Sequence, residues 1–342
     1  MQYSFRHIDK IEWTSLEKSE DCTVFKTKAW SDFLYETFGV RPYIIEITDE
    51  NGLLAGWFYG EIIKKIGIKI LASPFEGWTT SYQGLSLQKS ATTDERIEIY
   101  SQLRKWCFDN RICSLLQISD WQLRDAKLNA NGFKLVEGHS IYLDISADEN
   151  TLYRSFKQKS AQYAIHKAER LGVVVKEATG IGEFSHNYYS QLLDVFAKQD
   201  LTPTYDERRV SIMLKHLIPQ GKVVALEALH PESGKSMATI LFVFHNKLAF
   251  YWGAASWREY QKFCPNELLF FEAIKILKQH GVETIEMEGK RKYKEKYNPV
   301  EYSNSKLVAA RYPIIITMKD MAKQCYYTSR DIMSKTRKIW QR

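Results

Sequence analysis

The sequence predicts an α/β protein made of two tandem units, each a mixed, mostly antiparallel sheet flanked by helices, followed by a C-terminal helical tail. One observation is the length: 342 residues are about twice a typical domain. The other is an internal repeat, because both halves run in the order helix, hairpin, helix, strand. Hairpins joined to a strand–helix–strand crossover build an α/β layer in each unit.

In the first half, residues 29–38 are expected to form a helix. A hairpin follows, with strands RPYIIEI and LLAGWFYGEIIKK and with Asn51-Gly52 at the tip, a dipeptide that favours tight hairpin turns. Residues 94–119 then predict a helix that ends in a strand. This is the first copy of the repeat.

In the second half, the expected helix covers residues 184–198 and the hairpin pairs GKVVALEAL with MATILFVFHNKLAFYWG. Residues 266–288 predict a second helix and strand, with apolar residues at helical spacing. Gly281 stands where a C-terminal helix cap belongs. The second copy therefore repeats the first in order, without repeating its sequence.

The boundary between the units is expected near residues 144–150, where DISADEN interrupts the pattern. This predicts units at 1–146 and 147–313, and a basic helical tail at 314–342. Because no Pro- or Gly-rich linker separates the units, we expect them to share an interface. The tail, which carries Trp340 among basic residues, is expected either to pack on the second unit or to contact a membrane surface.

Composition excludes several classes of protein. Hydrophobic residues make up 44%, charged residues 26%, and the mean hydropathy is −0.37, as in an ordinary globular protein with a sizeable core. No apolar stretch approaches the ~20 residues that span a bilayer, and the N-terminus does not resemble a signal peptide. We expect a cytoplasmic protein, placed at the inner face of the membrane where the tail binds lipid.

The cysteines and histidines predict neither disulfides nor a metal site. The five cysteines are scattered without CxxC spacing, and the eight histidines form no HxxxH or HxH pair. Cys264 is a candidate nucleophile because His245 and His280 lie in the same half, but no base can be assigned to it from sequence. We expect reduced thiols and no bound metal.

A net charge of +7 is concentrated in clusters at residues 64–69, 157–170 and 290–296 and in the tail. Such clusters attract phosphate groups in nucleotides, lipid diphosphates, tRNA or anionic membranes. Lysines that alternate with aromatic residues leave an RNA-binding protein as an alternative, but no RNA-recognition motif, KH or zinc signature is present. We expect no DNA partner.

Four segments carry a resemblance to a known family: KAWSDFLYETFGVRPYIIEI, LASPFEGWTTSYQGLSL, YLDISADENTLYRSFKQKSAQYAIHKAERLGVVVKEA and EMEGKRKYKEKYNP. Together they resemble the Fem aminoacyltransferases, which build peptidoglycan interpeptide bridges, and the related polysaccharide-associated acyltransferases. The resemblance extends from Trp30 to Tyr312. It implies that each half is a GNAT-like (Gcn5-related N-acetyltransferase) domain.

The resemblance also implies a function. An acyl or aminoacyl group would pass to an amine or hydroxyl of a phosphate-bearing, UDP- or lipid-linked envelope precursor, either a muropeptide or a polysaccharide sugar. Direct attack needs no covalent enzyme intermediate. The implied co-substrate is acyl-CoA or aminoacyl-tRNA, with no tightly bound cofactor. The alternative is a non-catalytic binding protein of envelope assembly with a degenerate GNAT fold.

The closing motif supplies the expected catalytic groups. Lys294 is the first candidate to neutralise phosphate or a developing oxyanion, and Glu286 and Glu288 could act as a base or orient an amine. A salt bridge between one of these glutamates and a lysine is the equal alternative. Tyr293 and Asn298 stand where the family commonly has Phe and Gly, and Tyr293 and Tyr297 are expected to contact substrate.

Further substrate contacts are expected from the basic helix, although Ala161, Gln162 and His166 replace arginines that are usual in the family. The anion-binding candidates in this segment are Lys157, Lys159, Lys167 and Arg170, which would face the cleft between the units together with Lys26, Lys28 and Arg41. The candidate walls of the substrate groove are Tyr251, Trp252, Gly253, Ser256 and Trp257.

The loop WREYQKFCPNE stands where acetyl-CoA enzymes usually have a Gly-rich pyrophosphate loop, and it has no glycine. Either CoA is held by Arg258, Lys262 and the next helix N-terminus, or the donor is not CoA. Gly253 in an apolar strand predicts a bulge or a close backbone approach.

Overall fold

The computed structural model describes residues 2–321 except 66, 130, 199 and 200. The described strands form one mixed sheet of thirteen strands in the order β1-β2-β3-β4-β6-β13-β7-β12-β11-β10-β9-β8, and β5 pairs with β3 off this path. Their bounds are β1 Ser4–Ile8, β2 Pro42–Thr48, β3 Leu54–Lys65, β4 Ile68–Ser73, β5 Gly84–Leu87, β6 Leu115–Ile118, β7 Lys134–Asp144, β8 Val174–Glu177, β9 Val223–Leu229, β10 Ser236–His245, β11 Leu248–Ser256, β12 Thr284–Glu286 and β13 Val300–Ala310.

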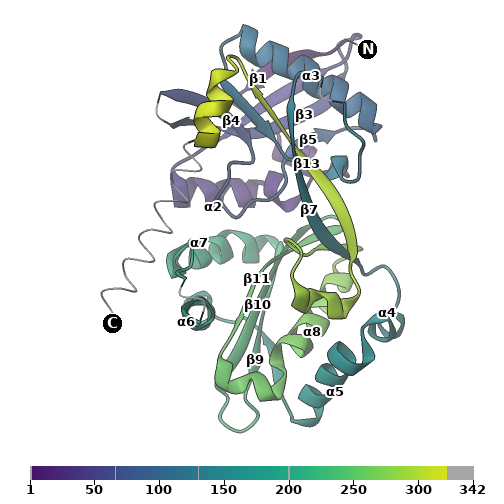
Figure 1. Ribbon diagram of the computed structural model, residues 1–342, viewed down its shortest axis with the longest axis vertical. Coiled ribbons are helices and arrows are strands. Elements are labelled where there is room, and N and C mark those ends of the chain that lie inside the picture. The colour runs from purple at the N-terminus through teal and green to yellow at the C-terminus, as the bar shows by residue number, and fades with distance from the viewer. Residues whose placement is uncertain (1, 66, 130, 199–200, 322–342) are drawn as a thin grey trace.

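Helices cover both faces of this sheet in each half (Figure 1). The α-helices are α1 Trp13–Glu17, α2 Lys28–Phe38, α3 Thr93–Asp109, α4 Glu149–Ser155, α5 Tyr163–Arg170, α6 Ile181–Ala197, α7 Glu207–Leu217 and α8 Pro265–Gln279. The short helical turns are η1 Val24–Lys26, η2 Trp121–Leu123, η3 Gln158–Gln162, η4 Ile218–Gln220, η5 Arg258–Phe263 and η6 Lys292–Tyr297.

The repeat predicted from sequence is confirmed. Strands β2 and β3 form the first hairpin, with Gly52 in the left-handed region at φ +76°, and β9, β10 and β11 form the second set. Helix α8 ends at the predicted cap, where Gly281 has φ +77°, a backbone conformation that glycine adopts without steric cost. Helix α7 and strand β5 were not predicted: β5 has only four residues, and α7 follows the segment LTPTYD, whose Pro and Thr residues are typical of a loop.

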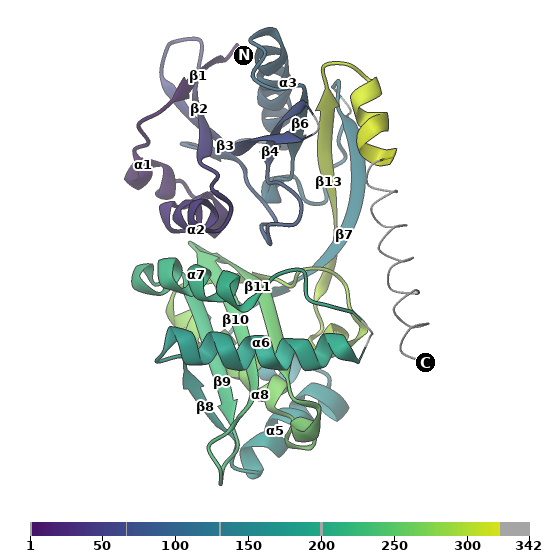
Figure 2. The same ribbon diagram turned by 90° about the vertical axis from the view of Figure 1, so that its left-hand side faces the viewer.

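Strands β7 and β13 join the two units. Their antiparallel register runs from Val300 opposite Tyr142 to Val308 opposite Lys134. The end of β13 also pairs with β6 of the first unit, whereas the end of β7 pairs with β12 of the second. Figure 2 shows both strands running from the upper to the lower half. The division at 146/147 stays a prediction, and the chain returns to the first unit's sheet after residue 300.

A buried aromatic cluster fills the space between the units. Phe25 from the first unit lies 4.5 Å from Phe250 of the second, measured between ring centroids, and both rings are fully buried. Trp30 and Phe33 on α2 belong to the same core as Val210 and Met213 on α7. The expected shared interface is therefore confirmed. Rigid aromatic packing of this kind fixes the orientation of one unit against the other.

The two units differ at the pair of parallel strands that each contributes to the sheet. In the second unit, β11 and β12 pair only from Leu248 opposite Thr284 to Phe250 opposite Glu286, after which β11 continues alone on this side. In the first unit, the equivalent β4–β6 pair is extended, since Ser119 N donates to Ser73 O at 2.7 Å and Gln83 N donates to Ser119 O at 2.9 Å. Among the described strands, β11 therefore continues beyond the end of its parallel partner β12, whereas β4 and β6 are paired to their last residues.

The described part of the tail, residues 314–321, is helical as expected, but it packs on the first unit, where Ile315 joins Leu115 and Val308 in one buried cluster, and not on the second unit. The remaining tail, with Cys325 and Trp340, lies outside the described residues, and the membrane contact stays a prediction. None of the helices within the described part of the chain has the length and apolar character that crossing a bilayer requires.

Glu61 is a buried carboxyl group in the first unit whose ionisation opposes folding. Its Oε1 accepts from Gln83 Nε2 at 2.8 Å, while Oε2 has no hydrogen-bond partner. Burial raises the pKa of Glu61 from 4.5 to about 8. The folded state therefore prefers the neutral carboxyl group, whereas the unfolded chain ionises above pH 4.5.

We predict that Glu61→Gln stabilises the protein increasingly as pH rises. Relative to wild type, the free energy of unfolding should gain about 1.4 kcal/mol per pH unit between 4.5 and about 8, and nothing below pH 4. Urea unfolding at several pH values measures this gain. Glu98→Gln, at an exposed site on α3, is the control and should show no such trend. A gain independent of pH would contradict the assignment.

Candidate functional site

Glu286, Glu288 and Lys294 lie together where β12 ends and β11 continues. Glu286 is the last residue of β12, Glu288 follows it by two, and Lys294 comes from η6. Glu286 is 1% exposed and Lys294 3%, so both charged groups are buried. The structure thus brings together the three residues that the sequence predicted as catalytic, beside the junction of the two units.

The Glu286 carboxylate is held by three hydrogen bonds. Tyr302 Oη donates to its Oε1 at 2.8 Å, Ser140 Oγ donates to the same oxygen, and the backbone N–H of Glu288 donates to Oε2 at 2.7 Å. Burial raises the pKa of Glu286, and these bonds oppose the rise because they favour the ionised form. Glu286 is therefore a fixed acceptor.

Glu288 has fewer partners and a strained backbone. Its φ is +54°, in the left-handed region that residues with a Cβ rarely adopt. The side chain accepts a hydrogen bond from Ser81 Oγ of the first unit. Desolvation of the carboxylate and repulsion from Glu286 raise the pKa of Glu288. An acid with a raised pKa and spare acceptor capacity has the properties of a general base.

Lys294 lies beside β11, at the point where β12 ends and β11 continues. Its Nζ donates to the carbonyl oxygens of Met287 and Gly289, the latter at 3.4 Å, and lies 4.8 Å from the ring centroid of Tyr251. Burial lowers the pKa of Lys294 to about 8, against the opposing effect of the two glutamates. This ammonium group can donate a hydrogen bond or a proton near neutral pH.

The free edge of β11 carries the predicted groove residues on two faces. The ring of Tyr251 faces Phe270 of α8, whereas Trp252 packs 5.2 Å from Tyr205 on the side of α6 and α7. The β10–β11 register shifts at Trp252, so both predictions for Gly253 are confirmed: a bulge lies beside it, and a Cβ there would stand 2.2 Å from Tyr188 Oη. Ser256 is buried and accepts from Asn266 Nδ2 at 3.0 Å.

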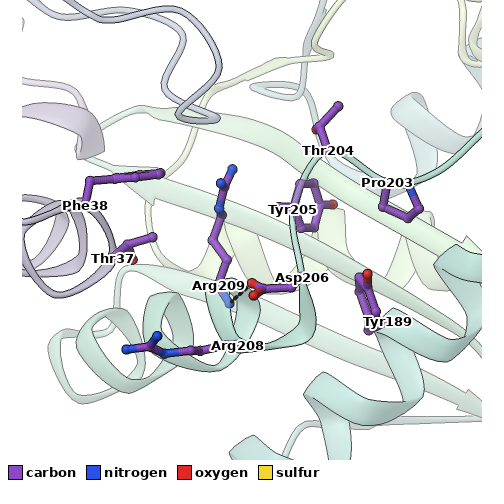
Figure 3. Close-up of a pocket in the computed structure, with 9 residues that line it drawn as sticks. All are labelled: Thr37, Phe38, Tyr189, Pro203, Thr204, Tyr205, Asp206, Arg208 and Arg209. Carbon is purple, nitrogen blue, oxygen red and sulfur yellow. Dashed lines mark hydrogen bonds between the residues drawn. The ribbon is translucent and has the colours of Figure 1, made fainter. Parts of the chain in front are cut away.

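A pocket of about 420 Å³ opens between the units, on the Trp252 side of the sheet (Figure 3). Arg209 extends into it, with its guanidinium 4.9 Å from the ring centroid of Phe38 and with Nε unpartnered. Arg208 lies beside it on α7, and Tyr205 and Tyr189 line the opposite side. Two guanidinium groups among aromatic rings are suited to a planar or phosphate-bearing anion.

The basic segment 157–170 lies elsewhere than predicted. Helix α5 packs on α8 and not on the pocket between the units. Lys157 N donates to Lys296 O at 2.9 Å, and Lys167 lies near Cys264 at the start of α8. Lys157, Lys159 and Arg170 are exposed. Lys157 and Lys167 therefore lie near the N-terminus of α8, and helix α5 of the basic segment packs on α8, which corrects the predicted place of this segment at the cleft between the units.

Three further basic residues named for that cleft are engaged within the first unit. Lys26 is buried, and its Nζ donates to Asp21 O and Leu85 O at 2.6 Å each. Lys28 forms an ion pair with Asp32, and Arg41 stacks on Tyr35. The prediction for Lys26 is wrong, because its charge is satisfied by backbone carbonyls that no sequence pattern reveals.

The two tyrosines of the closing motif have different environments. Tyr293 is exposed, whereas Tyr297 is a core residue whose ring stacks on Phe270 at 4.0 Å. Its predicted contact with substrate is therefore corrected to a packing role that fixes η6. Asn298 has φ +56°, in the left-handed region, which Asn tolerates better than most residues with a Cβ.

The loop before α8 places Arg258 and Lys262 on η5, both exposed. The helix itself begins with Pro265, which has no N–H to offer, and Glu267 in its first turn forms an ion pair with Lys296. A carboxylate already interacts with the positive end of this helix. The loop therefore differs from a Gly-rich pyrophosphate loop in its acidity as well as in its missing glycines.

Sequence reasoning missed Ser81, Tyr82, Ser140 and Tyr302 at the carboxylates and the arginine pair at the pocket. The adjacent Arg208-Arg209 was a usable signal, since it opens a helix preceded by Tyr205. The hydroxyl groups gave no signal, because they come from three segments that meet only in three dimensions.

Within the described residues, Cys22, Cys107, Cys113 and Cys264 are free thiols. No group of three or more His, Cys, Asp or Glu side chains in that part of the chain is arranged to hold a metal ion.

Comparison with known proteins identifies the second unit. Residues 154–296 match the family described as "Acetyltransferase (GNAT) domain". Comparison with curated proteins gives no match. The fold is similar to that of FemX, with 13% identity, a TM-score of 0.70, and coverage of 88% of this chain and 96% of the FemX chain.

Two further solved structures share the fold. A tandem GNAT protein from the clavulanic acid biosynthesis pathway is 12% identical, with a TM-score of 0.50 and coverage of 91% of this chain and 99% of the other. L-PGS from Bacillus licheniformis is 13% identical, with a TM-score of 0.51 and coverage of 89% and 93%. The chain thus has the fold of these tandem GNAT structures and contains a segment that matches a GNAT domain, as the resemblance read from its sequence implies.

We predict that Gly253→Ala destabilises the protein by about 1–3 kcal/mol, because the new methyl group meets the buried Tyr188 hydroxyl. Urea unfolding of Gly253→Ala, Tyr188→Phe and the double variant measures the coupling, and the double variant should lose less than the sum of the two. Gly182→Ala on α6, where a Cβ meets no atom within 4 Å, is the control and should cost nothing. A strictly additive cycle would contradict the proposed contact.

Proposed function

We propose that the protein is an acyltransferase that moves an acyl or aminoacyl group to an amine or hydroxyl of a cell-envelope precursor, a muropeptide or a polysaccharide sugar. The observation that carries this proposal is the cluster of Glu286, Glu288 and Lys294 at the point where β12 ends and β11 continues, inside the segment that matches a GNAT domain. A base and an ammonium group side by side are what direct acyl transfer requires.

In the proposed reaction, the acceptor nitrogen or oxygen attacks the acyl carbonyl carbon directly. Glu288 takes the proton that the acceptor releases, and the leaving group of the donor departs with a proton that Lys294 can supply. Lys294 also donates toward the oxygen on which negative charge develops. Glu286 keeps its charge throughout and holds Glu288 and Lys294 in place. No side chain forms a bond to the acyl group.

The pocket between the units is the proposed acceptor site. Its guanidinium groups, Arg208 and Arg209, suit the phosphates of a UDP- or lipid-linked precursor. The pocket lies on the Trp252 face of β11, whereas Tyr251 and Lys294 lie on the opposite face of this strand. Peripheral contact of the tail with the inner face of the membrane would bring a lipid-linked acceptor close. We therefore propose that the protein acts in the cytoplasm.

Two donors are proposed, acyl-CoA and aminoacyl-tRNA, and the structure around α8 favours the second. Glu267, paired with Lys296, already occupies the first turn of α8 where a pyrophosphate would bind, whereas the exposed Lys157, Lys159, Arg170, Arg258 and Lys262 and the half-buried Lys167 suit a polyanion that lies across the surface. Acyl-CoA is the co-substrate of acetyltransferases of the GNAT type and remains the reference in every assay.

We predict that Glu288→Gln lowers turnover by about a hundred-fold or more, with little change in KM, because only the base is lost. The pH profile of the wild type should be a narrow bell with its optimum near pH 8, because Glu288, whose pKa is raised to about 8, must be ionised and Lys294, whose pKa is lowered to about 8, must keep its proton. Glu295→Gln, an exposed glutamate on the same turn as Lys294, is the matched control. Full turnover in Glu288→Gln would remove Glu288 from the mechanism.

We predict that ligands raise the melting temperature in a pattern that identifies the acceptor and donor. A panel of acetyl-CoA, longer acyl-CoAs, UDP-sugars and a UDP-muropeptide is measured on wild type and on Arg209→Met. A UDP-linked ligand should stabilise the wild type and lose its effect in the variant, with Arg6→Met as the control. Binding of such a ligand without transfer from any donor would favour the non-catalytic binding protein.

A further inference from the structure

The loop of residues 74–83, which joins β4 to β5, is the part of the first unit that reaches the carboxylates of the second. Ser81 Oγ donates to Glu288 Oε1, and Tyr82 Oη lies 2.7 Å from Tyr302 Oη. Tyr82 is 5% exposed and Tyr302 3%, so this contact is shielded from water. Two consecutive residues of one loop therefore reach both carboxylates: Ser81 binds Glu288 directly, and Tyr82 reaches Glu286 through Tyr302.

The groups at the two ends of this hydrogen-bond chain, the Asn304 amide and the Glu286 carboxylate, fix the direction of each bond in it. Asn304 Nδ2 can only donate, and it lies 2.5 Å from Tyr82 Oη, which accepts. Tyr302 uses its hydrogen for Glu286, so Tyr82 must donate to Tyr302. Every hydrogen in the chain Asn304, Tyr82, Tyr302 then points toward Glu286. A chain of this kind polarises each hydroxyl and strengthens the last bond to the carboxylate.

We propose that Tyr82 and Ser81 are positioning residues that the first unit supplies to the second: Tyr82 orients Glu286 through Tyr302, and Ser81 orients Glu288. The acid–base pair is then complete only where loop 74–83 is docked on the second unit. What the pair does rests on the proposed function, whereas how the pair is held rests on the contacts alone.

The same loop also forms contacts beside the pocket between the units. Gly77 O accepts from Arg209 Nη1 at 3.4 Å, and the ring of Trp78 stacks on Phe38 with centroids 4.9 Å apart. One loop of ten residues therefore connects the arginine of the pocket with the carboxylate pair. An anion that draws Arg209 away from Gly77 would act on the loop that holds Ser81 and Tyr82.

The other groups that face Glu286 are independent of Tyr82. Ser140 from β7 and the N–H of Glu288 donate to Glu286, the Glu288 carboxylate repels it, and Lys294 from η6 is the nearby cation. None of these contacts passes through Tyr82. Removing the Tyr82 hydroxyl therefore breaks the hydrogen-bond chain from Asn304 to Tyr302, while it leaves the charges around Glu286 unchanged.

The test is a pH titration followed by NMR on protein labelled with ¹³C at the glutamate side-chain carboxyl carbon, with signals assigned by Glu286→Gln and Glu288→Gln. In Tyr302→Phe the pKa of Glu286 should rise by about one unit, since its carboxylate loses a donor. In Tyr82→Phe it should rise by a smaller amount, and in Ser81→Ala the pKa of Glu288 should rise. Tyr153→Phe, which loses a 3.1 Å bond to Gln162 O outside the relay, is the control.

An unchanged Glu286 pKa in Tyr82→Phe would overturn the role of Tyr82, and an unchanged Glu288 pKa in Ser81→Ala would overturn that of Ser81. Thermal unfolding of each variant confirms that the titrated species is folded, and the variants with phenylalanine keep the ring that packs. Because no substrate is needed, the titration is independent of the proposed reaction. A protein without transferase activity whose pKa values shift as stated would lose the proposed function and retain the positioning role.

Discussion

The long antiparallel pair of β7 and β13 is the constraint on which the rest of the structure depends. Its hydrogen-bond ladder crosses from one unit to the other, so the two sheets cannot rotate independently without breaking it. The ladder also supplies Ser140 from β7 and Tyr302 from β13, which both bind Glu286. One backbone interaction therefore fixes the relative place of the units and the carboxylate between them.

The two units carry an acidic residue at equivalent positions, but its surroundings differ between them. Asp120 follows the last β6 residue paired with β4 by two positions, as Glu288 follows the last β12 residue paired with β11. Asp120 is 4% exposed and bound by Arg96 at 3.2 Å and by Tyr100 Oη at 2.6 Å, so its charge is neutralised. Glu288 lacks an arginine partner and adopts a strained φ. The acid of the first unit is therefore engaged by a cation, whereas the acid of the second unit stays available.

The first unit contributes to the site of the second through this difference. Its own parallel strands remain bridged through Ser119, and its loop 74–83 turns outward to reach Glu288 and Tyr302. The opposite face of the second sheet carries Trp252 and the arginine pocket, so the proposed anion site and the proposed proton-transfer groups lie on two sides of β11. Under the proposed function, the sheet separates the recognition of a charged acceptor from the chemistry.

The repeat, the helices, the hairpins and the cap at Gly281 followed from sequence alone, because they depend on local periodicity and on backbone preferences that each segment carries by itself. The closing motif identified Glu286, Glu288 and Lys294 for the same reason: they lie within nine residues of one another. The tertiary structure decided which charges are available. It buried Lys26 against carbonyls, moved the basic helix to α8, placed Tyr297 in the core, and brought Ser81 and Tyr82 to a carboxylate pair about two hundred residues away. Contacts of that sequence separation depend on how two units dock, which no local pattern encodes.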